Sequence, residues 1–326
     1  MNELAFQQRL MQMLELRGEL DRQVEYLPSD MDISDRRSRG ECLTRPELAV
    51  LLAYAKLALH ADLLASSAGL EDPYFAQELG AYFPEAIKAR FPEAIAQHRL
   101  RRDIIATRLA NGLINEGGPT AFARIADQTG ADAGTIASAF VTARDAFRLP
   151  EVVAAIDALD NQMDGEVQLS LYLSIQDLVV GRTIWFLRNA SFAGGVEGVV
   201  QRYGAGIAAV RDTMHETLPE VWRAQSEARA AELVAQKVPE ALAQRLALLQ
   251  ALAVATDVAL VSETTGRDIP AAASTFYAVG RHFSVDDLVA QARMISAPDY
   301  YDRLALDRAL GELGTCVRRL TAEILS

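Results

Sequence analysis

The chain has 326 residues, half of them hydrophobic, and a net charge of −12 at pH 7. This length and apolar content predict a folded helical array or two domains, rather than a largely disordered chain. The negative charge disfavours general binding to nucleic acid, because acidic surfaces repel phosphate backbones.

The composition also points to a helical cytoplasmic protein. Cys42 and Cys316 lie far apart and form no CxxC motif, which indicates reduced thiols. We find neither a signal peptide nor a run of about 18 uncharged apolar residues, so no membrane partner is expected. Strong helix formers dominate and alternating strand patterns are lacking. We therefore expect an all-α multi-helix array, about three-quarters helical and without a sheet.

The first expected element is an amphipathic helix over 3–27, followed by a polar, charged connector over 28–42. A segment with so little to bury cannot offset its ordering entropy, so the connector is expected to be a mobile hinge. Residues 1–42 are accordingly interpreted as an N-terminal tether helix and connector.

The clearest helix begins after Thr44. The spacing of Thr44 and Glu47 is that of a capping box, and Pro46 falls in the first turn, where its missing N–H has no cost. Apolar residues then occur on every side, so this helix is expected to be buried all round. We place it at the centre of a first helical domain, 43–194.

Further helices are expected in chain order, bounded by glycine, proline or capping side chains such as Asp164, Asp268 and Ser284. The first domain is predicted to hold helices over 93–115, 119–128, 132–148, 150–161 and 165–190. A second domain, 195–326, is predicted to hold helices over 195–212, 239–263, 268–281, 284–296 and 299–325.

The second domain repeats part of the first. At a fixed offset of 136, residues 129–155 match 265–291 at nine of 27 positions, where this composition gives roughly two by chance. The same offset carries Arg182 onto Arg318. We therefore expect 101–190 and 237–326 to form related helical halves, with Phe140 and Phe276 in equivalent core positions.

Two local motifs are interpreted as structural. Gly204–Ala209 matches a loose GxGxxA fingerprint, but no strand precedes it, so close helix packing is favoured over a dinucleotide site. Asp160–Gly165 faintly resembles a calcium loop, but Leu171 stands where the loop needs a bidentate Glu.

The histidines and the basic run do not have the spacing of a metal site or a catalytic site. None of the four histidines lies within an HExxH motif or within eight residues of another; they are His60, His98, His215 and His282. The basic run Arg99, Arg101, Arg102 and Arg108 is interpreted as pairing with carboxylates within the fold or on another domain.

A DNA-binding helix-turn-helix over 125–148 is the sharpest rival interpretation. The second helix would read bases, but its charged positions begin with an acid, whereas a reader helix presents basic and amide groups early. A structural corner between two helices is therefore favoured. The candidate readers are Asp132, Thr135, Ser138, Thr142 and Asp145.

Several stretches resemble the C-terminal helical region of the large, roughly 180-kDa-class bacterial NAD-dependent glutamate dehydrogenases. Leu43–Lys56 is long and ungapped, and the likeness extends from about residue 5 onward. Shorter matching stretches are Leu20–Arg22, Glu25–Pro28, His98–Thr107, Asn111–Asn115, Trp185–Asn189 and Thr265–Arg267.

The resemblance implies a parent enzyme that oxidises L-glutamate to 2-oxoglutarate and ammonia with NAD. It also implies that the catalytic domain lies upstream, so that this segment is non-catalytic and serves assembly or regulation. Its implied partners are that upstream catalytic domain and other subunits of a homo-oligomer, without nucleic acid. No catalytic, cofactor-binding or metal residue is carried over to this chain, and NAD belongs to the parent enzyme. A DNA-binding or other helical interaction protein stays the alternative.

Overall fold

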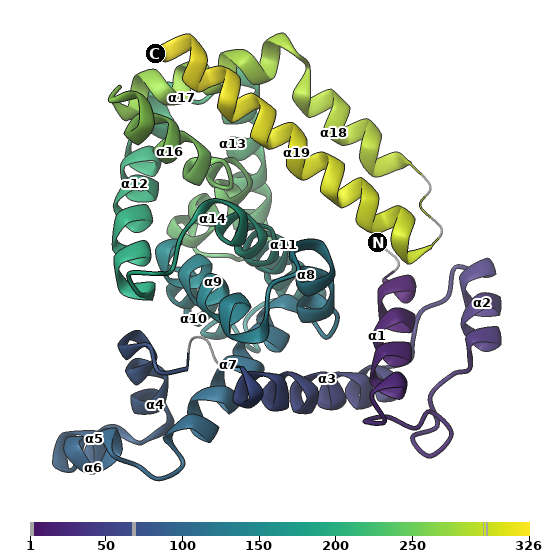
Figure 1. Ribbon diagram of the computed structural model, residues 1–326. Helices are drawn as coiled ribbons and strands as arrows, with labels where there is room; N and C mark the ends of the chain where they lie inside the picture. The colour runs from purple at the N-terminus through teal and green to yellow at the C-terminus, as the bar shows by residue number, and fades with distance from the viewer. Residues whose placement is uncertain (1–2, 67–69, 296, 298) are drawn as a thin grey trace. The chain divides into compact units, whose positions relative to one another are not determined.

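The computed structural model describes residues 3–66, 70–295, 297 and 299–326. It is 78% helical, and the described residues contain no strand, which confirms the all-α prediction (Figure 1). The helices before residue 147 are α1 Leu4–Leu16, α2 Asp30–Ser38, α3 Arg45–Ala65, the 3-10 turn η1 Pro73–Phe75, α4 Ala76–Tyr82, α5 Glu85–Arg90, α6 Pro92–Ala96, α7 Arg101–Gly117, α8 Ala121–Thr129 and α9 Ala133–Ala146. Those after it are α10 Leu149–Asp157, α11 Gly165–Asn189, α12 Val196–Thr217, α13 Glu220–Ala235, α14 Glu240–Ala247, α15 Leu249–Leu252, α16 Ala255–Thr265, α17 Ile269–His282, α18 Val285–Met294 and α19 Tyr300–Leu325.

The chain forms two compact units that interleave along the sequence. The first unit comprises Met1–Val141, Thr183–Glu197 and Pro298–Tyr301. The second comprises Thr142–Arg182, Gly198–Ala297 and Asp302–Ser326. Each unit is described below by itself.

The first unit is built around the packing of α3 on α7. Leu109 and Leu113 of α7 lie one turn apart and are buried, as are Leu59 and Leu63 of α3. A spacing of four residues places such side chains on one face of a helix, so each helix presents an apolar stripe to the other.

The start of α3 confirms the predicted capping box. The backbone N–H and the hydroxyl of Thr44 both donate to the Glu47 carboxylate, at 2.6 and 2.8 Å. The prediction that this helix is buried all round is wrong, since Leu57 is 65% exposed. The helix has apolar side chains on more sides than its neighbours cover, so only some of them are buried. The buried ones are Leu51, Ala55, Ala58, Leu59 and Leu63.

Among the described helices, α3 is long and apolar enough to cross a membrane. The pair Glu240–Ala247 and Leu249–Thr265, which bends by 45°, would be so only if the two parts formed one span. Asp62 of α3 forms a bidentate ion pair with Arg17, at 2.6 and 2.9 Å. A paired carboxylate and a buried stripe are the features of a core helix.

The N-terminal segment differs from its prediction. The helix expected over 3–27 ends at Leu16, before Gly18 with φ +70°. The connector expected over 28–42 holds helix α2, which Ser29 and Asp32 start with a capping box. Ile33 of α2 is fully buried, so the little apolar surface of this segment does anchor it to the fold.

Tertiary ion pairs anchor α2. Arg36 binds Glu47 of α3 with two hydrogen bonds, at 2.7 and 2.8 Å. At the other end, Asp30 accepts hydrogen bonds from Arg22 and Gln8, both at 2.9 Å. These residues form an ion-paired helix where an irregular connector was expected, and the mobility of 28–42 stays a prediction.

The helix bounds agree at the predicted offset of 136. Helix α9 begins at 133 and ends at 146, and α17 begins at 269 and ends at 282. Gly130 and Gly266, which precede these helices, share a left-handed conformation with φ of 70° and 69°. Phe140 and Phe276 are both buried, as expected of equivalent core positions.

Other helix bounds differ from the prediction. The helix expected over 93–115 is split into α6 and α7, and that expected over 239–263 into α14, α15 and α16. Asp268 caps α17 by accepting from the N–H of Ala271, at 2.8 Å. Ser284 precedes α18 with φ 48° and makes no side-chain cap, because its backbone is left-handed. The helix expected to reach Ser296 ends at Met294, and Ser296 lies outside the described residues.

Candidate functional site: an apolar groove between α17 and α19

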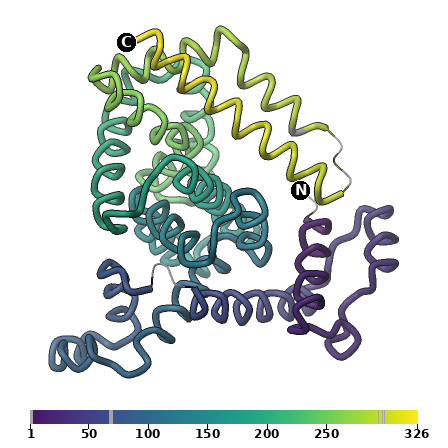
Figure 2. The backbone as a smooth tube through the Cα atoms, in the orientation of Figure 1, coloured from purple at the N-terminus to yellow at the C-terminus, as the bar shows by residue number. Residues whose placement is uncertain are grey.

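The second unit has an open groove between α17 and α19, with a volume of about 610 Å³. The chain reverses direction after α18, and α19 returns toward the start of α17 (Figure 2). The guanidinium of Arg267 donates to the carbonyl of Leu325 at 3.0 Å and ties the end of α19 to the loop before α17. The groove is lined by Ser274, Thr275, Ala278, Val279, His282, Phe283, Leu320 and Ile324.

The chemistry of this groove is that of a packing surface. Its lining is mostly aliphatic, with two hydroxyls and one imidazole, and His282 makes an edge contact with Phe283 at 4.8 Å. Such a surface gains free energy by removing apolar area from water. It therefore suits an apolar partner rather than a charged substrate.

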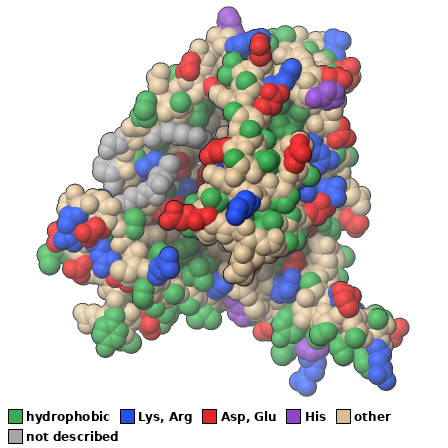
Figure 3. Space-filling view, turned by 180° about the vertical axis from the view of Figure 1, so that it is seen from behind, with side chains coloured by type: hydrophobic (Ala, Val, Ile, Leu, Met, Phe, Trp, Pro, Cys, Tyr) green, Lys and Arg blue, Asp and Glu red, His purple; other side chains and the backbone are tan. Residues whose placement is uncertain are grey.

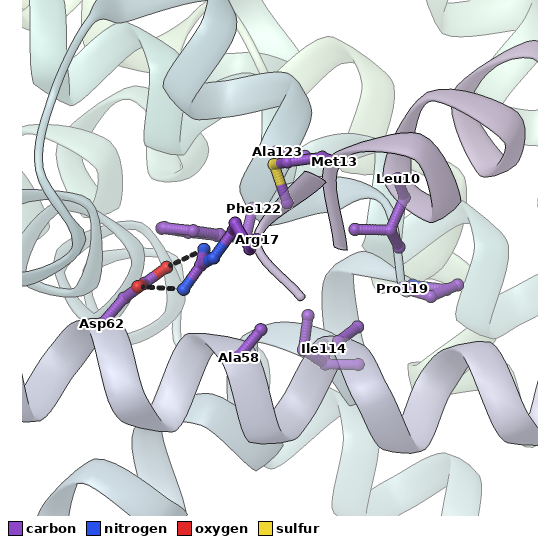
Figure 4. A pocket seen from close by; sticks show the side chains of 10 residues that line it. Leu10, Met13, Arg17, Ala58, Asp62, Ile114, Pro119, Phe122 and Ala123 are labelled. Carbon is purple, nitrogen blue, oxygen red and sulfur yellow. Dashed lines mark hydrogen bonds and ion pairs between the residues drawn. The ribbon is translucent and has the colours of Figure 1, made fainter. Parts of the chain in front are cut away.

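A second hollow, in the first unit, has a volume of about 10 Å³ (Figure 4). This is about the space that one water molecule needs. The Arg17–Asp62 ion pair closes one side, and Leu10, Met13 and Ile114 contribute apolar walls. The cavity is too small for a nucleotide or an amino acid.

The GxGxxA motif lies inside helix α12, as the structural interpretation predicted. A Cβ on Gly206 would come within 2.7 Å of the Cβ of Ala259, so only glycine allows α12 and α16 to approach this closely. A Cβ on Gly204 would lie 3.8 Å from the Cα of Ala146. These glycines serve helix packing.

The described residues contain no group of three or more side chains arranged to hold a metal ion. Asp164 accepts from the N–H of Glu166 at 2.8 Å and caps α11, as predicted. His215 lies beside Glu216, at 3.3 Å, and His98 accepts from the N–H of Leu100. The structure brings none of the four histidines together with another as a ligand set within the described ranges.

The candidate DNA-reading helix, α9, presents little surface. Ser138 and Thr142 are buried, and Ser138 donates to the carbonyl of Gly134 at 3.0 Å. Asp132 caps the helix by accepting from the N–H of Gly134 at 2.9 Å, and Asp145 binds Arg144 at 2.8 Å. Buried Ser138 and Thr142 cannot reach base edges, and the carboxylates of Asp132 and Asp145 are engaged within the fold.

The basic run pairs with carboxylates inside the first unit, as predicted. Arg101 and Arg102 bind Glu71, at 3.5 and 3.0 Å. Arg108 binds the nearly buried Glu78 at 3.0 Å, and Arg99 is exposed. Basic and acidic side chains are interspersed over the face shown in Figure 3. This mixture differs from the continuous positive stripe that tracks a nucleic-acid backbone.

One buried charged cluster was not predicted from the sequence. Arg182 and Arg318 both bind Asp257, at 3.5 and 2.6 Å. Burial lowers the pKa of the Arg182 guanidinium, and the attraction of Asp257 opposes that change. The offset of 136 between Arg182 and Arg318 could be read from the sequence, but it did not predict that both would bind Asp257.

Comparison with known proteins gives a consistent result. A family model described as "Glutamate dehydrogenase, C-terminal" matches residues 40–326. The chain is 34% identical over 322 residues to an NAD-specific glutamate dehydrogenase of Pseudomonas aeruginosa, covering 99% of this chain and 20% of the relative. For the enzyme of the same name from Halomonas elongata, identity is 32% over 317 residues, covering 97% and 20%. For that from Mycobacterium tuberculosis, it is 29% over 307 residues, covering 94% and 19%. The chain thus spans about a fifth of the length of these relatives.

Proposed function

Because the chain belongs to the glutamate dehydrogenase C-terminal family, we propose that it is a non-catalytic helical segment of an NAD-dependent glutamate dehydrogenase. The parent reaction would convert L-glutamate and NAD to 2-oxoglutarate, ammonia and NADH. The observation that carries this proposal is the match over 40–326 to a family named for one end of a dehydrogenase, with relatives about five times as long.

The role proposed for the segment is assembly or regulation within a cytoplasmic homo-oligomer. Its partners would be the upstream catalytic domain and other subunits, with neither a membrane nor nucleic acid. The all-α architecture supports this role, since helix faces provide extended packing surfaces. We also retain as part of the proposal a division into 1–42, 43–194 and 195–326, with 237–326 repeating 101–190.

The first test is an activity assay of the isolated chain. Purified protein is mixed with glutamate and NAD, and NADH is followed by its absorbance. The proposal expects no turnover above the blank at any protein concentration. A rate that rises in proportion to the concentration of this chain would refute the non-catalytic role.

The second test addresses assembly. The matching fifth is deleted from the Pseudomonas aeruginosa enzyme, and size is measured by chromatography with light scattering. The proposal expects a smaller oligomer or an altered response of the rate to substrate concentration. An enzyme with unchanged size and unchanged kinetics would show that the segment neither assembles nor regulates.

A further inference from the structure

One face of α17 is exposed, although its repeat equivalent is buried. Ser274, Ala278 and His282 lie one turn apart along α17 and are exposed. At the offset of 136 they correspond to Ser138, Thr142 and Ala146 of α9, which are buried. A four-residue spacing places each set on one helix face, so the same face is covered in one copy and open in the other.

The difference continues into α18. Phe283 is 52% exposed and Leu288 is 47% exposed, whereas the equivalent Phe147 and Val152 are 3% and 0% exposed. Phe283 and Leu288 are therefore exposed to water, although the residues at the equivalent positions in the first copy are buried. Covering them would remove apolar surface from water, which is favourable.

Helix α12 provides part of the cover in the first copy. Gly204 of α12 lies against Ala146, the equivalent of the groove residue His282. The contact is close because Gly204 carries no side chain, and Gly206 plays the same role against Ala259. At Ala146 the equivalent face is thus covered by a helix that places a glycine at the contact, and two residues further along, a second glycine packs the same helix on α16.

The groove has dimensions that fit such a helix. Its floor contains Ser274, Thr275 and Ala278, which allow a backbone to approach closely. Leu320 and the 59% exposed Ile324 of α19 stand along one side. A helix with its side chains is roughly 10 Å across, and an open groove of about 610 Å³ accommodates one face of it.

We propose that this groove is the docking site of an amphipathic α-helix whose contact face carries glycine and alanine. The helix is supplied by a part of the longer glutamate dehydrogenase outside residues 1–326, so this inference rests on the proposed function. A second copy is the weaker candidate for the source. Its glycine-bearing helix α12 is already packed, with Gly206 against Ala259, and would have to leave that position.

The test is a cross-link from the groove floor in the longer enzyme. Ala278→Cys is introduced, the exposed Cys42 and Cys316 are replaced by serine, and a benzophenone maleimide is attached. After irradiation of the purified enzyme, peptide mass spectrometry identifies what was captured. The matched control is Ala305→Cys, an alanine on α19 that is also exposed and lies outside the groove lining.

The proposal expects capture of a glycine- and alanine-containing helical segment outside 1–326, at least ten times more from position 278 than from position 305. Absence of a cross-link at 278, equal capture at both positions, or capture of residues within 1–326 from another copy would overturn it. The activity assay is independent of this outcome. A longer enzyme that oxidises glutamate but gives no cross-link from position 278 refutes the docking site alone, whereas a captured helix in a longer enzyme without glutamate dehydrogenase activity refutes the proposed function.

Discussion

Arg182 and Arg318, which lie 136 residues apart in the sequence, bind the same carboxylate, that of Asp257. Arg182 also donates to the carbonyl of Ala253 at 2.6 Å and to the hydroxyl of Thr256 at 3.1 Å. The three charged side chains are largely buried in the second unit. One carboxylate therefore joins α11, α16 and α19, the helices that carry these residues.

Replacement of Asp257 should strongly destabilise the protein. Asp257→Asn keeps the shape of the side chain but removes the charge that compensates two buried guanidiniums. Breaking a buried pair in this way costs about 3–5 kcal/mol of unfolding free energy, measurable by urea denaturation. The control is Glu263→Gln, whose pair with Arg202 is half exposed and contributes less than about 1 kcal/mol. Equal effects of the two substitutions would contradict this assignment.

Gly206→Ala should disrupt the packing of α12 on α16. The added methyl would lie 2.7 Å from the Cβ of Ala259, and overpacking of this kind costs about 1–3 kcal/mol. Adding Ala259→Gly should recover most of the loss, since it removes the clashing atom. Gly198→Ala, on the same helix with nothing within 4 Å, should be neutral or stabilising by up to about 1 kcal/mol. Thermal unfolding of the wild type, the two single glycine variants and the double variant measures these differences. If Ala259→Gly does not restore the stability lost in Gly206→Ala, the clash with Ala259 is not the cause of that loss.

The Arg36–Glu47 pair predicts a pH dependence of stability. The hydrogen bonds from Arg36, with those from Thr44, lower the pKa of the Glu47 carboxyl to about 2 from its ordinary 4.5. A carboxyl whose pKa is lowered by folding stabilises the folded state above its unfolded pKa, and that contribution is lost as the pH falls from 4.5 through 2.

The measurement compares the wild type with Glu47→Gln. The variant should be less stable by about 1–3 kcal/mol at pH 7, and this difference should shrink below pH 4.5. The exposed pair of Arg39 and Glu41 provides the control, because Glu41→Gln should change stability by less than about 1 kcal/mol. A difference for Glu47→Gln that stays constant down to pH 2 would argue against the ion pair as its source.

The repeated halves should superpose as corresponding helices. We expect 101–190 and 237–326 to share helix order and crossing handedness, with Phe140 and Phe276 at matching core positions. The agreement of α9 with α17, and of the left-handed Gly130 with Gly266, motivates this expectation. A crystal structure of the chain provides the measurement. Opposite crossing handedness in the two halves would exclude a duplication.

Local signals in the sequence predicted much of the helical layout. Thr44 with Glu47 and Asp268 with Ala271 form the expected caps, because capping depends on residues within one turn. Helix α2 was missed although Ser29 and Asp32 have capping-box spacing, because the contacts that anchor it are one buried side chain, Ile33, and an ion pair with a residue 11 positions away. Neither contact leaves a periodic pattern in the sequence.

The groove was equally invisible in the sequence. Thr142 and Ala278 occupy equivalent positions on α9 and α17, yet the first is buried and the second exposed. Residue type does not distinguish them, since burial is decided by what else packs against the helix. The breaks between α14, α15 and α16 also lack a glycine or proline that would have marked them.

The interleaving of the two units has a consequence for folding. The first unit draws on three separate stretches of chain, and Tyr300 from the last of them contacts Phe6 edge-on at 5.5 Å and donates to Asp127. Synthesis must therefore reach residue 301 before the first unit can complete its core. Contacts between residues this distant in sequence carry a large loop-closure entropy and slow folding. Fragments cut between residues 6 and 300 would leave this aromatic surface exposed and prone to aggregation.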